Sequence, residues 1–335
     1  MEDKSNQIPV IDIAPFQAGR ADGKAAVAAQ VKRACEEIGF FTIVGHGVAP
    51  ALIEETRNVS NRFFDLPLEQ KLKIKRAPGA ASRGYAVTGD LALAYSRGDK
   101  SPPDYQEGFG IGALEFPADD PYYHTEMARK FIVPNVWPER PPTLRSSLER
   151  YYRVMAALSA DIMRIFALAL DLDEHFFVGK IDKAVSFLRI IRYPAQSDPP
   201  LDGQLRAGAH TDYGTLTILL AEDKPGGLQV QVRDGNWVDV HPLPDSFVIN
   251  IGDLMMQWTN DHWVSNLHRV ANPPPQFAEV PRLSVVFFHQ PNYDAEIRCI
   301  EKYAGAASMP KYPPTTAGAH WIGKQSKARN VNAAR

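Results

Sequence analysis

The longest regular pattern in the sequence is helical. From residue 143 to residue 170, apolar residues recur at intervals of three or four positions, which is the spacing of one face of an α-helix. The pattern predicts a long scaffold helix with one buried face. Because this spacing is typical of core packing, we interpret the aromatic and sulfur-containing side chains on that face as core residues rather than a cofactor site. The predicted buried positions are Leu144, Leu148, Tyr151, Met155, Leu158, Ile162, Phe166 and Ala169.

Downstream of this helix, the pattern changes to short apolar runs rich in β-branched and aromatic residues. Glycine, proline, aspartate and asparagine separate the runs, and Asp234-Gly235 is a typical hairpin turn. Many short strands without long helices between them favour a mixed α/β protein with a mainly β catalytic core, a double-stranded β-helix (jelly roll) whose facing sheets can hold a ligand. The predicted strands are residues 185–193, 216–220, 228–232, 237–240, 247–251 and 283–288.

The N-terminal third alternates strands and helices. Residues 8–13 and 40–44 are predicted strands, and residues 24–38 and 50–65 are predicted helices, the first of which ends at Gly39. Residues 77–103 are rich in glycine, alanine, serine and proline and predict a long loop. The proline-rich residues 117–142 predict an irregular connection. His46 stands between two glycines, and we interpret it as a turn or packing residue.

Two side chains with metal-ligand chemistry, His210 and Asp212, stand two positions apart. On an extended strand such residues emerge on the same face, so an imidazole and a carboxylate can bind one ion from one side. A His-x-Asp pair by itself is also common on surface strands and turns. With His268 as a third ligand, the set becomes the facial triad of non-haem Fe(II) oxygenases, which leaves coordination positions open for other ligands.

Other histidines compete with His268 for the third ligand position. In a regular strand that begins at Arg282, alternate residues share a face, so His289 falls on the face opposite to Arg282. We therefore favour His268 as the ligand. His241 and His262 are interpreted as hydrogen-bonded surface or packing residues.

Arg282 and Ser284 lie at the start of the apolar run 285–288. This arrangement places a guanidinium and a hydroxyl on one face of a predicted buried strand. A buried arginine is rarely left unpaired. If no acidic residue faces it, the expected partner is an anionic ligand, and a guanidinium fork matches a carboxylate.

These motifs together resemble one known family, although each alone is a weak signal. The sequence is similar to the iron- and 2-oxoglutarate-dependent oxygenases related to isopenicillin N synthase, and the resemblance covers about residues 8 to 320. The catalytic motifs that carry it are His210-Thr211-Asp212, His268-Arg269-Val270, Arg282-Leu283-Ser284 and Arg192-Tyr193-Pro194. The N-terminal motifs are Ile8-Pro9-Val10-Ile11-Asp12, Gly39-Phe40-Phe41 and Gly45-His46-Gly47-Val48.

The resemblance implies a set of cofactors and their binding residues. The proposed triad would bind Fe(II), with 2-oxoglutarate and O2 as cosubstrates and ascorbate as a candidate reductant. Arg282 would pair with the distal carboxylate of 2-oxoglutarate, and Ser284 and Tyr193 would add hydroxyl hydrogen bonds. Oxidative decarboxylation would release succinate and CO2 and lead to hydroxylation of a small-molecule substrate.

The chain also departs from the resembled family. Ile191 stands where many plant members carry an asparagine, so we expect one polar contact to the cosubstrate to be absent. The segment between His268 and Arg282 is longer than in many plant members, which predicts a loop excursion. Residues 210–214 and 288–292 further resemble the bacterial ethylene-forming enzyme. Arg189 matches an arginine important in that enzyme, which makes it a further candidate for cosubstrate binding.

Four residues are candidates for contact with the primary substrate. In the resembled family an N-terminal segment covers the mouth of the metal pocket, and Arg83, Tyr85 and Tyr105 lie in the matching part of this chain. Ordinary loop anchoring is the alternative interpretation of these three. Phe288 shares the face of Arg282 by strand alternation, and we expect it to line the pocket.

Composition narrows the class of protein. The 335 residues are 44% hydrophobic, enough to bury a large core, and 37 basic against 39 acidic residues give a net charge of −2. That balance does not favour a phosphate backbone, so nucleic acid is not an expected partner. Cys35 and Cys299 are too few for a disulfide framework. Without an apolar signal core or an apolar run of about 18 residues, we expect a cytoplasmic protein with no membrane partner.

We expect four regions along the chain: an N-terminal region of the non-haem dioxygenase type (1–120), a connection with the scaffold helix (121–180), the jelly-roll catalytic core (181–320) and a C-terminal tail (321–335). The leading function is a 2-oxoglutarate-dependent oxygenase. The alternatives are an iron oxidase without an oxoacid, as isopenicillin N synthase is, an ethylene-forming-type enzyme, and a non-catalytic jelly-roll binding protein. Arg282 and Ser284 favour the first over the oxidase, and a complete triad disfavours the binding protein.

Overall fold

Two facing sheets form the centre of the protein, and the computed structural model describes residues 8–77, 83–196, 198–305 and 309–329. Within these residues, β1 and β2 pair in parallel and all other neighbouring strands pair antiparallel. The major sheet has, in spatial order, β1 (Val10–Asp12), β2 (Phe40–Val44), β10 (Phe247–Ile251), β7 (Leu216–Ala221), β12 (Arg282–His289), β5 (Phe187–Tyr193), β4 (Glu107–Gly112) and β3 (Gly84–Ala86). The minor sheet has β6 (Ala207–His210), β11 (His268–Val270), β8 (Leu228–Gln231) and β9 (Trp237–Asp239), and a separate pair joins β13 (Glu296–Ile297) to β14 (Thr315–Thr316).

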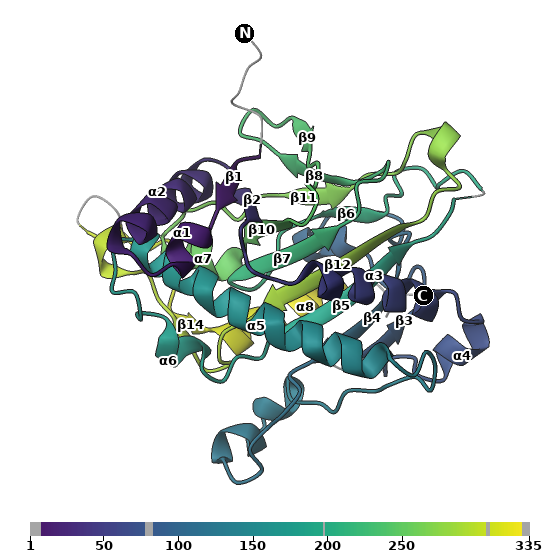
Figure 1. The fold of residues 1–335 in the computed structure, drawn as a ribbon, viewed down its shortest axis with the longest axis horizontal. Helices are drawn as coiled ribbons and strands as arrows, with labels where there is room; N and C mark the ends of the chain where they lie inside the picture. The colour runs from purple at the N-terminus through teal and green to yellow at the C-terminus, as the bar shows by residue number, and fades with distance from the viewer. Residues whose placement is uncertain (1–7, 78–82, 197, 306–308, 330–335) are drawn as a thin grey trace.

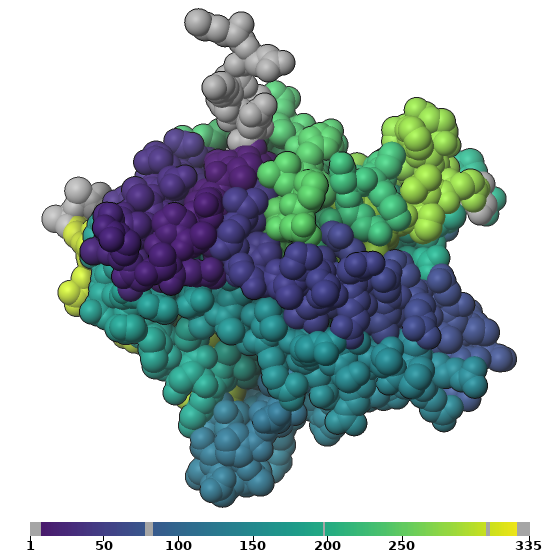
Figure 2. All heavy atoms as spheres, in the orientation of Figure 1, coloured from purple at the N-terminus to yellow at the C-terminus, as the bar shows by residue number. Residues whose placement is uncertain are grey.

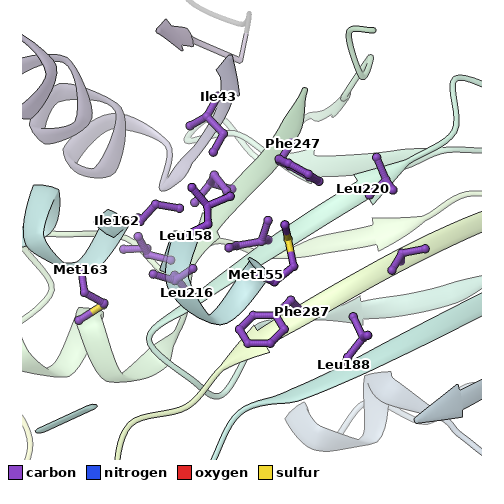
Figure 3. Packing of buried hydrophobic residues seen from close by; sticks show 14 of the residues in the cluster. Ile43, Met155, Leu158, Ile162, Met163, Leu188, Leu216, Leu220, Phe247 and Phe287 are labelled. Atoms are coloured by element: carbon purple, nitrogen blue, oxygen red, sulfur yellow. The ribbon is translucent and has the colours of Figure 1, made fainter. Parts of the chain in front are cut away.

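Helices cover the face of the major sheet that points away from the minor sheet (Figure 1). The longest, α5, confirms the predicted scaffold helix and packs against α2, α3, β7 and β12. Its apolar face buries Met155, Leu158 and Ile162 in one cluster with side chains of the major sheet (Figure 3). The helices are α1 (Ala14–Gln17), α2 (Ala21–Glu37), α3 (Pro50–Phe64), α4 (Leu68–Leu72), α5 (Leu144–Ala169), α6 (Val178–Ile181), α7 (Asp253–Trp258) and α8 (Ala317–Arg329). Short 3₁₀-helices are η2 (Leu93–Arg97), η3 (Pro121–His124), η4 (Ala128–Lys130), η5 (Pro275–Phe277) and η6 (Glu301–Tyr303).

Alternation along β12 separates the helical core from the space between the sheets. Leu283, Val285 and Phe287 belong to the cluster under the helices, whereas Arg282, Ser284, Val286 and Phe288 face the other side. The strand therefore has the regular period of two that the parity argument assumed. A second apolar cluster fills part of the space between the sheets, with Ile191, Leu219 and Val286 from the major sheet and Leu228, Val230 and Val270 from the minor sheet.

The N-terminal region is built into the major sheet. It supplies β1 and β2 at one edge and β3 and β4 at the other. Gly39 ends α2 and turns the chain into β2 with a φ of +69°, and an added Cβ there would lie 1.9 Å from the carbonyl oxygen of Val264. That position therefore requires glycine, as the predicted helix end implied.

Some local predictions differ from the structure. The predicted loop at residues 77–103 contains β3 and η2, although its residues 78–82 lie outside the described part of the chain. β3 exists because it pairs with β4 and exchanges main-chain hydrogen bonds with the segment after α4, partners that no local pattern reveals. Asp212 is not on the strand of His210, since β6 ends at His210. The segment expected as a C-terminal tail begins inside α8.

The predicted irregular connection between β4 and α5 carries only η3 and η4. It protrudes from the body of the protein as the blue-teal lobe in Figures 1 and 2. Among the described residues, no helix is both long enough and apolar enough to cross a membrane.

Candidate functional site

The three residues of the predicted triad come together between the two sheets. His210 ends β6 and His268 begins β11, and the two residues are paired directly across the strands. Oδ1 of Asp212 lies 3.9 Å from Nε2 of His210 and 3.8 Å from Nε2 of His268. All three ligand atoms lie within 4.8 Å of one another. One metal ion can therefore bind to all of them.

Main-chain carbonyl groups orient both imidazole rings. Nδ1 of His210 lies 2.7 Å from the carbonyl oxygen of Gly208, and Nδ1 of His268 lies 3.2 Å from that of Asn266. Because a carbonyl oxygen only accepts hydrogen bonds, each Nδ1 carries the proton. The lone pair of each Nε2 is then free to bind a metal.

Two side chains of the major sheet hold the Asp212 carboxylate. Thr217 on β7 and Asn250 on β10 both donate hydrogen bonds to Oδ2 of Asp212, Asn250 over 2.7 Å. This pairing leaves Oδ1 facing the two histidines. The main-chain N–H of Asp253 also donates to the carbonyl oxygen of Asp212 over 2.8 Å, which fixes the loop after β6.

The protonation state of the site suits a metal. Burial and the neighbouring His268 lower the pKa of His210 to about 4. This imidazole is therefore neutral at pH 7, as a metal ligand must be. Two imidazoles and one carboxylate match the ligand set that binds non-haem Fe(II). The donor set thus fits the ion that the sequence implied.

A cavity of about 490 Å³ extends from the triad between the sheets, a volume that suits a small molecule. Side chains from one face of β5 and β12 line it side by side, because the two strands pair in register. From β5 these are Phe187, Arg189, Ile191 and Tyr193, and from β12 they are Arg282, Ser284, Val286 and Phe288.

Arg282 lies in this cavity without an acidic partner. Its side chain is buried, and Nη1 donates to Oγ of Ser284 over 2.9 Å. Its Nε has no hydrogen-bond partner, and no carboxylate forms an ion pair with it in the part of the chain that the structure describes. The ring of Tyr193 lies 5.8 Å from the guanidinium carbon. Burial lowers the pKa of Arg282, and the charges of Tyr193, Glu222 and Asp223 only partly oppose that shift. A buried cation without a directly paired anion is costly, so this end of the cavity favours an anionic ligand.

The candidate substrate contacts divide into two groups. Phe288 lines the cavity as expected. Arg83, Tyr85 and Tyr105 are not among the lining residues, and their side chains form hydrogen bonds within the protein instead. Arg83 and Tyr105 donate to main-chain carbonyl oxygens over 3.0 Å, and Tyr85 donates to the carboxylate of Glu107 over 2.6 Å. The structure therefore supports the loop-anchoring interpretation for these three residues.

Helix α8 covers one side of the cavity. Gln325 is among the lining residues. Nζ of Lys324 lies 5.5 Å from the ring centre of Tyr213 and 2.7 Å from Oδ2 of Asp253. Since the main-chain N–H of Asp253 binds the carbonyl oxygen of Asp212, this ion pair ties α8 to the loop that carries a metal ligand.

The other histidines lie outside the cavity lining. His289 is buried on the opposite face of β12, as predicted, with Nδ1 2.6 Å from Oγ1 of Thr215. His262 pairs with a surface carboxylate over 2.8 Å, and the side chain of His241 is 80% exposed. His46 is a packing residue, with Nε2 2.9 Å from a main-chain carbonyl oxygen.

Sequence reasoning missed the two residues that position Asp212. Thr217 and Asn250 are each the single polar residue in an otherwise apolar strand. A buried polar side chain needs a partner, so this pattern was the available signal. It does not by itself identify the partner as Asp212.

Comparison with known proteins agrees with this geometry, which is that of the non-haem iron dioxygenases. Residues 184–291 match the 2OG-Fe(II) oxygenase superfamily, and residues 8–140 match the family described as "non-haem dioxygenase in morphine synthesis N-terminal". The chain belongs to the 2OG-Fe(II) oxygenase superfamily, in its isopenicillin N synthase-like group. The predicted family, jelly-roll fold and enzyme class are confirmed, as are the predicted Fe(II), 2-oxoglutarate and O2.

Relatives match along nearly the whole chain. The 2-oxoglutarate-Fe(II) type oxidoreductase hxnY of Emericella nidulans is 36% identical over 92% of this chain and 86% of the relative. Homoarginine-6-hydroxylase 2-ODD-233 of Oryza sativa is 34% identical over 95% of this chain and 96% of the relative. A full-length Neurospora crassa protein, whose crystal structure is a complex with alpha-KG, has a TM-score of 0.82 and 30% identity, and the match covers 98% of both chains. These matches do not favour an oxidase without an oxoacid, an ethylene-forming enzyme or a binding protein.

Proposed function

We propose that this oxygenase binds 2-oxoglutarate with its distal carboxylate on Arg282, Ser284 and Tyr193, and hydroxylates a small molecule held in the rest of the cavity. The observation that carries the proposal is the Arg282 guanidinium, which is buried and aimed into the cavity without an acidic partner among the described residues. A carboxylate accepts two parallel hydrogen bonds from such a fork.

The neighbours of Arg282 complete the binding site. Ser284 already accepts a hydrogen bond from Arg282, so its own proton can be donated to the neighbouring Tyr193 or to a ligand. Burial raises the pKa of Tyr193 even though Arg282 opposes that shift, so its hydroxyl stays protonated and remains a donor. Ile191 also lines the cavity and adds only apolar surface, so it provides no polar contact to the cosubstrate, as we expected from the sequence.

Fe(II) held at this site would supply the redox chemistry that couples decarboxylation of 2-oxoglutarate, with release of succinate and CO2, to hydroxylation of the substrate. The protein holds the ion through His210, Asp212 and His268. Val286 and Phe288 line the space beside it and exclude water from the reacting groups. A small-molecule substrate agrees with the cavity volume, and the relatives that have substrate names act on small molecules such as homoarginine.

The test is titration of the anaerobic Fe(II) protein with 2-oxoglutarate, followed by metal-to-ligand charge-transfer absorption. We expect a saturable band in the wild type. Arg282→Ala leaves the distal carboxylate without its charged partner, and a broken buried charge pair costs about 3–5 kcal/mol. The oxoacid affinity should then fall by about a hundredfold or more, whereas iron binding should survive.

Two controls sharpen this test. Arg282→Lys should recover only part of the loss, because an ammonium group cannot form the two-pronged contact. Arg192→Ala removes a cation from the opposite face of β5, where Arg192 pairs with Asp65 over 2.5 Å, and should leave the oxoacid affinity unchanged. A wild-type protein that shows no band at saturating oxoacid, yet oxidises a substrate with O2 alone, would be an oxidase without an oxoacid.

A further inference from the structure

We propose that Arg189 binds an anionic group, such as a carboxylate, on the primary substrate. The proposal rests on the proposed function, in which one carboxylate of 2-oxoglutarate binds the metal and the other binds Arg282. Both ends of the oxoacid are then committed, and neither is left for Arg189. The proposal therefore changes the role of Arg189 that the sequence suggested, from the cosubstrate to the substrate.

Arg189 lies apart from Arg282, the residue proposed to bind the distal carboxylate of 2-oxoglutarate. Arg189 and Tyr193 lie on the same face of β5, four residues apart, and Tyr193 pairs directly with Arg282. At about 3.3 Å per residue, the two arginines start about 13 Å apart along the sheet. Arg189 pairs with Val286 instead. Phe288 is two residues beyond Val286 on the same face of β12. Phe288 also pairs with Thr217, whose hydroxyl binds Asp212.

The guanidinium of Arg189 forms no hydrogen bond or ion pair within the part of the chain that the structure describes. The charge of Asp104 raises the pKa of Arg189, but no hydrogen bond joins the two side chains. The buried carboxylate of Asp104 instead accepts hydrogen bonds from two main-chain N–H groups and from the side chain of Gln106. Arg189 therefore presents unused donors to the cavity.

The charge balance of the cavity calls for an anion. Its described lining includes four cationic side chains, Lys75, Arg76, Arg189 and Arg282, but only two carboxylates, Asp90 and Asp212. Asp90 already pairs with Arg76 over 4.0 Å. Fe(II) and 2-oxoglutarate bring equal and opposite charges, so the excess of positive charge persists when both are bound. Although burial and the charge of Arg76 lower the pKa of Arg189 to about 10, its guanidinium remains charged at neutral pH.

The surface beside Arg189 defines the rest of the substrate. The rings of Phe187 and Phe288 stack with their centres 4.7 Å apart, and both line the cavity. An apolar or aromatic part of the substrate would lie against this wall while its anionic group binds Arg189. Because Phe288 pairs with Thr217, whose hydroxyl binds Asp212, that arrangement brings a C–H bond of the apolar part close to the metal site.

The experiment compares carboxylates with the matching neutral amides. Mn(II) replaces Fe(II) so that no turnover occurs, and the protein is saturated with 2-oxoglutarate. Calorimetric titration then measures the binding of benzoate and benzamide, phenylacetate and phenylacetamide, and hexanoate and hexanamide. We expect at least one acid to bind about ten- to a hundredfold more tightly than its amide, as a charge-assisted hydrogen bond implies. In Arg189→Gln this preference should disappear, and in Arg189→Lys it should persist in part.

Arg192→Gln is the matched control, because Arg192 lies on the opposite face of the same strand. It removes the same charge and should leave the preference for the acid unchanged. Equal binding of acids and amides, no binding of any acid at millimolar concentration, or a preference that survives Arg189→Gln would each overturn the proposal.

A separate measurement distinguishes this proposal from the proposed function. The affinity of the Mn(II) protein for 2-oxoglutarate should be the same in the wild type and in Arg189→Gln. If that affinity falls as far as it does in Arg282→Ala, Arg189 belongs to the cosubstrate site, and the oxygenase assignment still stands. If the wild type does not bind 2-oxoglutarate at all, the proposed function itself fails.

Discussion

Asn250 donates a hydrogen bond to Oδ2 of Asp212 over 2.7 Å, from a central strand of the major sheet to a metal ligand in the loop after β6. Two segments 38 residues apart in the sequence thus meet at the carboxylate. The hydrogen bond selects which oxygen faces the histidines, so Asn250 positions a ligand without touching the metal itself.

Replacement of Asn250 should therefore weaken metal binding. Asn250→Leu keeps the branched shape of the side chain but removes its donor, and loss of a group that orients a metal ligand typically costs ten- to a hundredfold in metal affinity. Competition with a chelator of known affinity measures the change. Asn292→Leu is the control, since Asn292 is also buried but binds Asp182 and Lys183 away from the site. Equal metal affinities in the two variants would contradict the positioning role of Asn250.

Removal of Asp212 itself should have a larger effect. Asp212→Ala deletes the anionic ligand of the triad and leaves two neutral imidazoles, so we expect loss of turnover and weaker iron binding. Iron content after dialysis and succinate release from 2-oxoglutarate measure the two effects. Full activity with unchanged iron content would contradict the assignment of Asp212 as a metal ligand.

Tyr193→Phe tests the cosubstrate site with a small change. The substitution removes one hydroxyl beside Arg282 and keeps the ring that packs near the guanidinium. Loss of one neutral hydrogen bond should weaken 2-oxoglutarate binding by about 0.5–1.5 kcal/mol, which is about two- to tenfold. The charge-transfer titration measures this difference, and an unchanged affinity would show that the hydroxyl points elsewhere.

The ion pair between Asp253 and Lys324 should contribute stability that depends on pH. Burial opposes ionisation of Asp253, but His320 and Lys324 together lower its pKa to about 2. A carboxyl group with a lowered pKa stabilises the folded state above its unfolded pKa of about 3.9, and this contribution is lost as the pH falls toward 2.

Lys324→Met should therefore lower the unfolding free energy of the metal-free protein by about 1–2 kcal/mol at pH 7. The difference from the wild type should shrink between pH 4 and pH 2. Urea titration at several pH values measures it. Lys311→Met is the control, because Lys311 pairs with Asp261 at an exposed site and should cost little. A difference that does not vary with pH would contradict the role of Asp253.

The sequence predicted most completely those parts that local spacing determines. The period of α5 and the alternation of Arg282, Ser284 and Phe288 along β12 follow from the positions of apolar residues, and the structure has both. The triad was predictable for a different reason. Its residue types have a chemistry that few other combinations share.

The parts that were not predicted depend on contacts between distant segments. β6 and β11 are only four and three residues long, and the pairing of His210 with His268 makes them strands. Tyr85 was a candidate substrate contact because its position in the chain matched a family segment, yet it binds Glu107, which Lys71 also contacts over 2.7 Å. No local pattern shows that these three side chains share one buried site.

Because the active site is divided between two sheets, the distance between the sheets limits the length of the oxoacid that can bind. The metal ligands His210 and His268 belong to the minor sheet and Arg282 to the major sheet, so an oxoacid that reaches both must span the gap. The apolar side chains packed between the sheets, such as Val230 and Val286, set the width of that gap. A diacid one carbon shorter or longer would then lose one of its two attachments. Apolar packing between the sheets thereby becomes a determinant of which oxoacid the enzyme accepts.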